Sequence, residues 1–380
     1  MTDLTCDPLE ALRARTSAKW TTFPGDVLPL FVAEMDFPIA APISEAIIAR
    51  VLASDTGYVG SPAPLGAAFA GFAARAWGWQ VDPARVRTTT DVSVAIVETL
   101  RRVLDPGDGV IITPPVYPPF FDLVPEAGGT VVEVPLVDDG AAHSLDLDGI
   151  EAAFAAGARA LLLCNPHNPL GLVHSRASLE ALAELADRYD ATVVSDEIHA
   201  PLVHSGIRFH PFLSVSDAAR DRGVCVTSAS KGWNIAGTKC AIILAASDRG
   251  MATLDSMPYE VNFRTSQLGL HASVAAFEQG GPWLDAAVNA IETSADLMHE
   301  LIARHLPGVV FRRPAASYLG WLDFRPLGWG DDPSIRALES GRVALNAGHT
   351  FGRQGAGFAR INLACSPEVL AEAVRRLAAA

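Results

Sequence analysis

Short apolar runs alternate with longer helical patterns over most of the chain. The runs are apolar throughout rather than alternating, as expected for strands that a sheet buries on both faces. The helical pattern is clearest over Arg176–Tyr189, where leucines and alanines recur at helical spacing. This alternation predicts an α/β fold with a mostly parallel central sheet covered by helices on both faces. The predicted strands are Val110–Thr113, Thr130–Val134, Ala160–Leu163, Thr192–Ser195, Val224–Thr227 and Ala241–Leu244.

The pattern changes near residue 281. A long helical pattern over Trp283–His305 is followed by short strands at Val309–Phe311 and Tyr318–Phe324. Ser366, followed by a proline and a glutamate, opens a last helix. We therefore expect a large ligand-binding domain over residues 41–280 and a smaller α+β domain over residues 281–380. An N-terminal segment, residues 1–40, is expected to contribute to the smaller domain.

Composition narrows the class of protein. Of 380 residues, 49% are hydrophobic and 19% are charged, which favours a large packed core over disorder. The net charge of −14 opposes binding to nucleic acid or to a membrane surface but allows a small anionic ligand. The start of the chain lacks the pattern of a signal peptide, and no apolar run is long enough to span a bilayer. The 5 scattered cysteines are typical of a cytoplasmic protein with reduced thiols.

Polar residues follow three of the predicted strands directly. One strand runs into Asn165–Asn168, the next into Asp196 and Glu197, and a third into Ser228–Lys231. Open α/β sheets bind ligands beyond the carboxyl ends of their strands. We therefore expect an amide, a carboxylate and an amine to meet at one place.

Lys231 lies in the stretch SASKGWNIAGTKC, residues 228–240, among small and mostly uncharged neighbours. Burial lowers the pKa of a lysine and leaves a nucleophilic amine. Pyridoxal 5'-phosphate (PLP) needs such an amine for its Schiff base, and a carboxylate, here Asp196, to keep its ring nitrogen protonated. On its own, Lys231 could be a surface charge and Asp196 a helix cap; the matched neighbours favour the cofactor site.

The rest of a PLP site can be assigned to nearby residues. The aromatic ring of Tyr117, in the stretch PPVYPPF, could stack on the cofactor ring. A helix start offers backbone N–H groups to a phosphate. The candidates for binding the phosphate end of the cofactor are Ser228, Ser230, Lys239, Val92 and Ser93.

Several longer stretches together resemble one family. The chain is similar to fold-type I PLP-dependent enzymes of the class I/II aminotransferase superfamily, which have an aspartate aminotransferase-like fold. More narrowly, it resembles the MalY/PatB-type cystathionine β-lyases, or C–S lyases. The matching stretches run in family order over nearly the whole chain: LFVAEMDFP at 30–38, GYVGSP at 57–62, PPVYPPF at 114–120, CNPHNPLG at 164–171, SDEIHAPLV at 195–203, the lysine stretch, YLGWLD at 318–323 and GFARINLAC at 357–365.

The resemblance implies further roles. Asn168, together with His199, would hydrogen-bond the phenolic oxygen of PLP. Arg360 would bind the substrate α-carboxylate, with help from the backbone of Ala33 and from Asn168. Tyr58 would reach the phosphate of a neighbouring subunit, so the resemblance also implies a homodimer with shared active sites.

The resemblance also implies the reaction: β-elimination on cystathionine or an S-substituted cysteine, giving a thiol, pyruvate and ammonia. Two alternatives remain open at this point, a PLP-dependent aminotransferase and a non-catalytic PLP-binding regulator. A metal site at Cys164, His167 and His199 would lack a fourth ligand, so no metal is expected. The chain departs from the family pattern at Leu170, at Trp233 and in the stretch 90–93, which lacks a glycine; none of these changes removes a catalytic group.

Overall fold

The computed structural model describes residues 4–380, and its main element is a central sheet. The sheet has 7 strands in the order β2-β10-β9-β8-β7-β3-β4. Their bounds are β2 (Val86–Thr89), β3 (Gly109–Ile112), β4 (Thr130–Glu133), β7 (Ala160–Cys164), β8 (Thr192–Asp196), β9 (Gly223–Thr227) and β10 (Ala241–Leu244). Strand β10 runs antiparallel to both of its neighbours, and the other pairs are parallel. The prediction of a mostly parallel sheet is confirmed. Strand β2 was not predicted, because it is short and three of its four residues are polar.

Successive residues of the inner strands enter two different apolar cores, one on each face of the central sheet. In β7, Leu161 and Leu163 belong to one core, whereas Ala160 and Leu162 belong to the other. This is why the strand sequences read as continuous apolar runs. The expectation of burial on both faces is wrong for β4, where Thr130 and Glu133 are exposed, because β4 has a neighbour on one side only.

Helices complete both cores. The first core includes residues of α3 (Ala41–Leu52), α4 (Ala63–Trp77), α7 (Leu147–Ala155), α8 (Arg176–Arg188), α9 (Asp217–Arg222), α10 (Ala229–Gly232) and α13 (Gln267–Gln279). The second includes residues of α5 (Val92–Val103), α6 (Phe120–Glu126), α11 (Asp248–Asp255) and α12 (Tyr259–Phe263). The helix expected over Arg176–Tyr189 is present and ends one residue earlier, at Arg188.

A second sheet and a third core lie toward the C-terminus. The sheet has 4 strands in the order β11-β12-β15-β14. All of its pairs are antiparallel. The bounds are β11 (Val310–Phe311), β12 (Leu319–Asp323), β14 (Asn346–Ala347) and β15 (Phe358–Asn362), with helices α14 (Gly281–His305), α15 (Pro333–Glu339) and α16 (Pro367–Ala379). Ser366 caps α16 by accepting a hydrogen bond from the N–H of Val369 at 3.2 Å, as its position in the sequence indicates.

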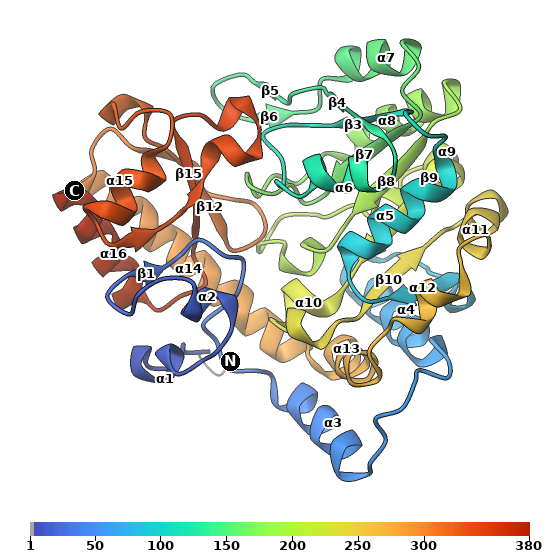
Figure 1. Ribbon diagram of the computed structural model, residues 1–380, viewed down its shortest axis with the longest axis horizontal. Coiled ribbons are helices and arrows are strands. Elements are labelled where there is room, and N and C mark those ends of the chain that lie inside the picture. Colours follow the sequence, from blue (N-terminus) through green and yellow to red (C-terminus); the bar gives the residue numbers. More distant parts are fainter. Residues whose placement is uncertain (1–3) are drawn as a thin grey trace.

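The N-terminal segment packs against this C-terminal part of the chain (Figure 1). Strand β1 (Leu28–Pro29) pairs in parallel with β13 (Val343–Ala344). Leu28 and Leu30 are buried in the third core together with residues of α14 and α16. The segment also contains the short helices α1 (Leu9–Arg13) and α2 (Ala18–Thr21).

Helix α3 lies at the lower edge of Figure 1 and packs one face against α13. Three of its apolar side chains are largely exposed: Ile48 at 54%, Val51 at 52% and Leu52 at 81%. Within residues 4–380, none of the helices has the length and apolar character needed to cross a membrane.

Candidate active site

The carboxyl ends of β7, β8 and β9 meet a cavity of about 590 Å³. This volume is typical of small-molecule sites. Residues from the N-terminal segment and from the second sheet complete its wall. Eleven of the sequence-predicted site residues line it: Ala33, Val92, Ser93, Tyr117, Asn168, Asp196, His199, Ser230, Lys231, Lys239 and Arg360. The structure thus brings together residues that lie more than 300 positions apart in the chain.

Lys231 sits in α10, a single helical turn that follows β9. Its Nζ donates a hydrogen bond to the carbonyl oxygen of Ala33 at 3.0 Å. Burial, followed by the positive charge of Arg360, lowers the pKa of Lys231 from its usual 10.5 to about 8. A neutral, nucleophilic amine is therefore accessible close to neutral pH.

Asp196 ends β8 and faces the same cavity. One of its carboxylate oxygens accepts a hydrogen bond from the N–H of Ile198 at 3.1 Å. Burial raises the pKa of Asp196 to about 7, against the opposing effects of that hydrogen bond and of the Lys231 charge. Because burial disfavours the ionised form of Asp196, a cationic N–H group placed beside it in the cavity would stabilise that ionised form.

Arg360 projects from β15 into the cavity. Its Nη1 donates to Oδ1 of Asn168 at 3.0 Å, and its Nη2 donates to the carbonyl of Phe31 at 3.0 Å. Burial lowers the pKa of Arg360 to about 10, so it is a cation at neutral pH. Among residues 4–380 it forms no ion pair, and its buried Nε has no partner. A buried cation without a counter-ion predicts that an anionic ligand binds beside it.

Two further residues of the cavity, His199 and Tyr117, are uncharged near neutral pH. Burial, together with the positive charges of Lys231 and Arg360, lowers the pKa of His199 to about 3. Burial and the negative charge of Asp196 raise the pKa of Tyr117, so its phenol stays protonated. Both side chains can therefore serve the site as neutral hydrogen-bonding or stacking groups.

The predicted phosphate-binding residues lie at the start of α5 and beside it. Val92 and Ser93 are the first residues of this helix, and the Asp91 side chain caps it by accepting from the N–H of Val94 at 3.0 Å. Nζ of Lys239 lies 3.0 Å from the other carboxylate oxygen of Asp91. Lys239 thus places positive charge at the helix N-terminus, where a phosphate is favoured.

Two sequence-predicted residues do not line this cavity. The Ser228 hydroxyl donates to the carbonyl of Cys240 at 2.6 Å, which ties α10 to the segment before β10. Tyr58 is 79% exposed, and its ring lies 4.9 Å from that of Phe263. The roles expected for both residues stay predictions.

The sequence analysis missed two residues, Tyr318 and Asn234, that hydrogen-bond the backbone of the N-terminal segment beside Lys231. The Tyr318 hydroxyl donates to the carbonyl of Ala33 at 3.0 Å, the same oxygen that Lys231 contacts. The Asn234 side chain accepts from the N–H of Met35 at 2.8 Å and donates to its carbonyl at 2.9 Å. The only signals were the YLGWLD stretch and the position of Asn234 three residues after the lysine.

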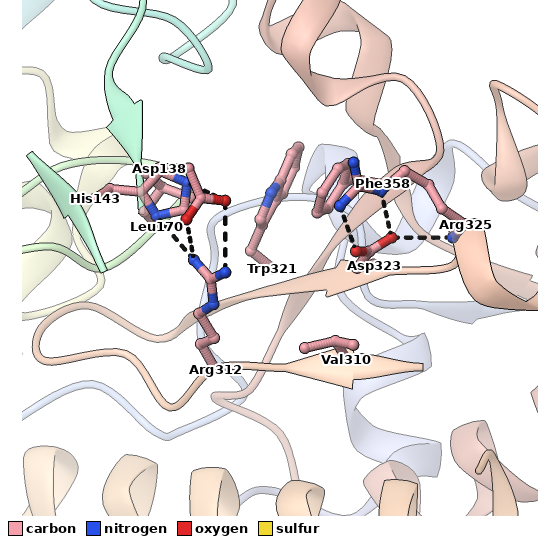
Figure 2. A pocket seen from close by; sticks show the side chains of 9 residues that line it. All are labelled: Asp138, His143, Leu170, Val310, Arg312, Trp321, Asp323, Arg325 and Phe358. Carbon is pink, nitrogen blue, oxygen red and sulfur yellow. Dashed lines mark hydrogen bonds and ion pairs between the residues drawn. The ribbon is translucent and has the colours of Figure 1, made fainter. Parts of the chain in front are cut away.

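A second, smaller pocket lies beside the hairpin of β5 (Val137–Asp138) and β6 (His143–Ser144) (Figure 2). Its volume is about 60 Å³. Both of its arginines are already paired: Arg312 with Asp138 at 3.0 Å and Arg325 with Asp323 at 2.7 Å. Because these charges are compensated and that of Arg360 is not, the larger cavity is the candidate active site.

The residues around the larger cavity fit PLP. One cavity is lined by four groups that the cofactor needs. They are the Lys231 amine with its lowered pKa, the Asp196 carboxylate with its raised pKa, the N-terminus of α5 beside Lys239, and the aromatic ring of Tyr117. Each matches a separate part of the cofactor. Across residues 4–380, no group of 3 or more His, Cys, Asp or Glu side chains could hold a metal ion.

Comparison with known proteins places these features in a family context. The family model described as "Aminotransferase class I and II" matches residues 56–377. A protein of Mycobacterium leprae, named as a candidate cystathionine beta-lyase, is 44% identical over 97% of this chain and 96% of its own length. The cystathionine beta-lyase of Corynebacterium glutamicum is 37% identical over 97% of this chain and 98% of its own length.

The fold is matched by a solved structure as well. A protein of Corynebacterium diphtheriae, described as a candidate PLP-dependent beta-cystathionase, superposes with a TM-score of 0.93. The two are 37% identical, and the match covers 99% of this chain and 98% of the other. The resemblance inferred from the sequence stretches is thereby confirmed.

Proposed function

This chain belongs to the class I and II aminotransferase family, and from that premise we propose that it is a PLP-dependent carbon–sulfur lyase. It takes cystathionine or another S-substituted cysteine and, with one water, yields a thiol, pyruvate and ammonia. The observation that carries the proposal is that Lys231, Asp196 and Arg360, whose charge has no counter-ion within residues 4–380, line one cavity. The names of the relatives that match the chain over nearly its full length point to the same reaction.

The cavity residues divide the binding of the cofactor among them. Lys231 would hold it covalently through Nζ, Asp196 would keep its ring nitrogen protonated, and Tyr117 would stack on the ring. Lys239 and the start of α5 would bind its phosphate. When bound, PLP stabilises the negative charge that develops at the α-carbon of an attached amino acid.

The chain's own groups then direct the reaction. Arg360 binds the substrate carboxylate through its planar fork and so orients the α-carbon toward Lys231. Nζ of Lys231, free at that stage, accepts the proton that the α-carbon releases. A pKa of about 8 suits this exchange, because the amine can both take up and return a proton near neutral pH. The electron pair left at the α-carbon would form a double bond to the β-carbon as the thiolate leaves, and one water would convert the released aminoacrylate to pyruvate and ammonia.

Pyruvate release from cystathionine in the absence of any keto acid tests this proposal. We expect steady release by the holoenzyme, loss of turnover in Lys231→Ala, and unchanged turnover in Arg304→Ala, which alters an exposed cation on α14. Strict dependence on a keto acid would instead make the chain an aminotransferase. Cofactor binding with no turnover of any thioether would make it a regulator.

We also propose that the chain acts as a homodimer in the cytoplasm. The exposed apolar side chains on the outer face of α3 and the exposed Tyr58 support a dimer, because a monomer would leave this apolar surface in water. The unpaired thiols of all five cysteines support a reducing compartment. Sedimentation of the purified holoenzyme measures the first point, and fractionation of the source cells measures the second.

A further inference from the structure

Ser317 lies where the chain passes from β11 to β12 and contacts the segment that follows β8. Its N–H donates to the carbonyl of Leu202 at 2.8 Å, and its own carbonyl accepts from Nε2 of His204 at 2.8 Å. The N–H of His204 donates to the carbonyl of Ala315 at 3.0 Å. These contacts fix the backbone of Ser317 on both sides, with its side chain buried at 2% exposure.

The Ser317 hydroxyl has one partner within the described chain. Its Oγ lies 3.0 Å from Nδ1 of His199, and both side chains are buried. A buried hydroxyl that donates nowhere leaves its proton unsatisfied, which is costly. The hydroxyl therefore donates and Nδ1 accepts, so the proton of the neutral imidazole is on Nε2.

The backbone of Ser317 gives a second, independent observation. Its φ is +69°, in the left-handed region that side-chain-bearing residues rarely adopt. Glycine adopts this conformation with much less strain. A serine here is explained by what its hydroxyl does, since the backbone alone would favour a glycine.

The tautomer of His199 decides what its ring offers to the cavity that it lines. Nε2 has no hydrogen-bond partner among residues 4–380, and Lys231, Asp196 and Arg360 line the same cavity. A neutral imidazole with its proton on Nε2 offers a donor there; the other tautomer offers an acceptor. We propose that Ser317 is a positioning residue that fixes His199 as the Nε2–H tautomer, so that the ring donates a hydrogen bond to the cofactor's phenolic oxygen. The identity of that acceptor rests on the proposed function, whereas the tautomer does not.

The direct test is the protonation state of the two ring nitrogens of His199, read by long-range ¹H–¹⁵N correlation on full-length protein with ¹⁵N-labelled histidine. The signals are assigned by their loss in His199→Gln. In the wild type, with cofactor and after its removal, we expect a protonated Nε2 and an unprotonated Nδ1. In Ser317→Gly, which removes the hydroxyl and relieves the backbone, we expect signals averaged between the two tautomers.

The matched control is Ser205→Gly. Ser205 is a nearby serine whose hydroxyl donates to Glu292 at 2.9 Å, away from His199. The Ser205→Gly variant should leave the His199 signals unchanged. A protonated Nδ1 in the wild type would overturn the proposal, and so would a folded Ser317→Gly with wild-type signals. Should Ser317→Gly fail to fold, the wild-type spectrum still decides.

A second readout follows the bound cofactor. A donor stabilises the less protonated form of the group that it faces, so its loss raises the pH midpoint of the holoenzyme's visible absorbance change. We expect an upward shift in Ser317→Gly and Ser317→Ala, and none in Ser205→Gly. If the wild type has the Nε2–H tautomer but the Ser317 variants show no shift of the midpoint, the phenolic oxygen is not the acceptor. A chain that takes up no PLP would overturn the proposed function and leave the tautomer measurement valid.

Discussion

Nη1 of Arg360, on β15, lies 3.0 Å from Oδ1 of Asn168, so this hydrogen bond joins the second sheet to the segment that follows β7. The contact holds the guanidinium in place but leaves its charge without a counter-ion. We therefore expect this part of the cavity to bind the α-carboxylate of the substrate. The first prediction follows from that geometry.

Arg360→Lys is expected to lower kcat/KM for cystathionine by about 10²-fold, because lysine keeps the charge but loses the planar fork. The loss should fall mainly on KM, since the α-carboxylate is bound before as well as during the reaction. Steady-state kinetics with saturating PLP measure this, and Arg304→Ala serves as the control. Unchanged KM together with unchanged kcat would show that the carboxylate binds elsewhere.

The lowered pKa of Lys231 predicts a pH-dependent stability of the cofactor-free protein. The folded pKa of about 8 lies below the usual 10.5, so the unfolded chain binds more protons between these values. Stability should therefore rise with pH across this window. Lys231→Met removes the cost of burying the charge and is expected to be about 1–3 kcal/mol more stable than the wild type at pH 7. The difference should shrink toward pH 10.

Urea unfolding at several pH values measures that difference. Lys239→Met is the matched control, because the Lys239 side chain is 54% exposed and pairs with Asp91. A difference between the wild type and Lys231→Met that stays constant from pH 7 to pH 10 would contradict the prediction.

The sequence alone predicted most of the central sheet, and most of the site residues that it predicted line the cavity at the edge of that sheet. Continuous apolar runs identify strands buried on both faces, and polar residues at the ends of β8 and β9 identify the edge of the sheet where the cavity lies. The order of the strands in the sheet, that is, which strand pairs with which, could not be predicted from these patterns. The pairing of β2 with β10 depends on packing between segments more than 150 residues apart, and β2 itself carries little apolar signal.

The arrangement around Lys231 could not be predicted for a similar reason. Lys231 and Tyr318 both donate to the carbonyl of Ala33, across separations of 198 and 285 residues. A backbone carbonyl has no signature in the sequence, so neither contact could be inferred from residue types. The N-terminal segment enters the site only because packing against the third core places it there.

A buried ion pair helps to hold that segment. Nζ of Lys19 lies 2.5 Å from Asp36, with side-chain exposures of 0% and 1%. Lys19→Met leaves the Asp36 carboxylate buried without its cation, and we expect a loss of about 3–5 kcal/mol in the free energy of unfolding. The double variant with Asp36→Asn should recover part of this loss.

Arg342→Ala is the matched control for that measurement. It breaks an exposed ion pair with Asp26 at 2.8 Å and should lower the free energy of unfolding far less than Lys19→Met does, because solvent screens the two charges. Denaturant unfolding of the three variants and the wild type gives the comparison. Equal losses in Lys19→Met and Arg342→Ala would mean that the buried pair contributes no more than a surface pair.

The exposed position of Tyr58 leads to the last prediction, which concerns shared active sites. If Tyr58 serves the neighbouring subunit, Tyr58→Ala and Lys231→Ala each lose activity alone but complement each other in a mixed dimer. In that dimer one site combines an intact Lys231 with an intact Tyr58 from the partner. Random reassociation of equal amounts should restore about a quarter of wild-type activity, since half the dimers are mixed and each has one complete site. Pyruvate release after co-refolding measures the recovery. A mixture no more active than the two variants measured separately would mean that each subunit supplies its own tyrosine or needs none.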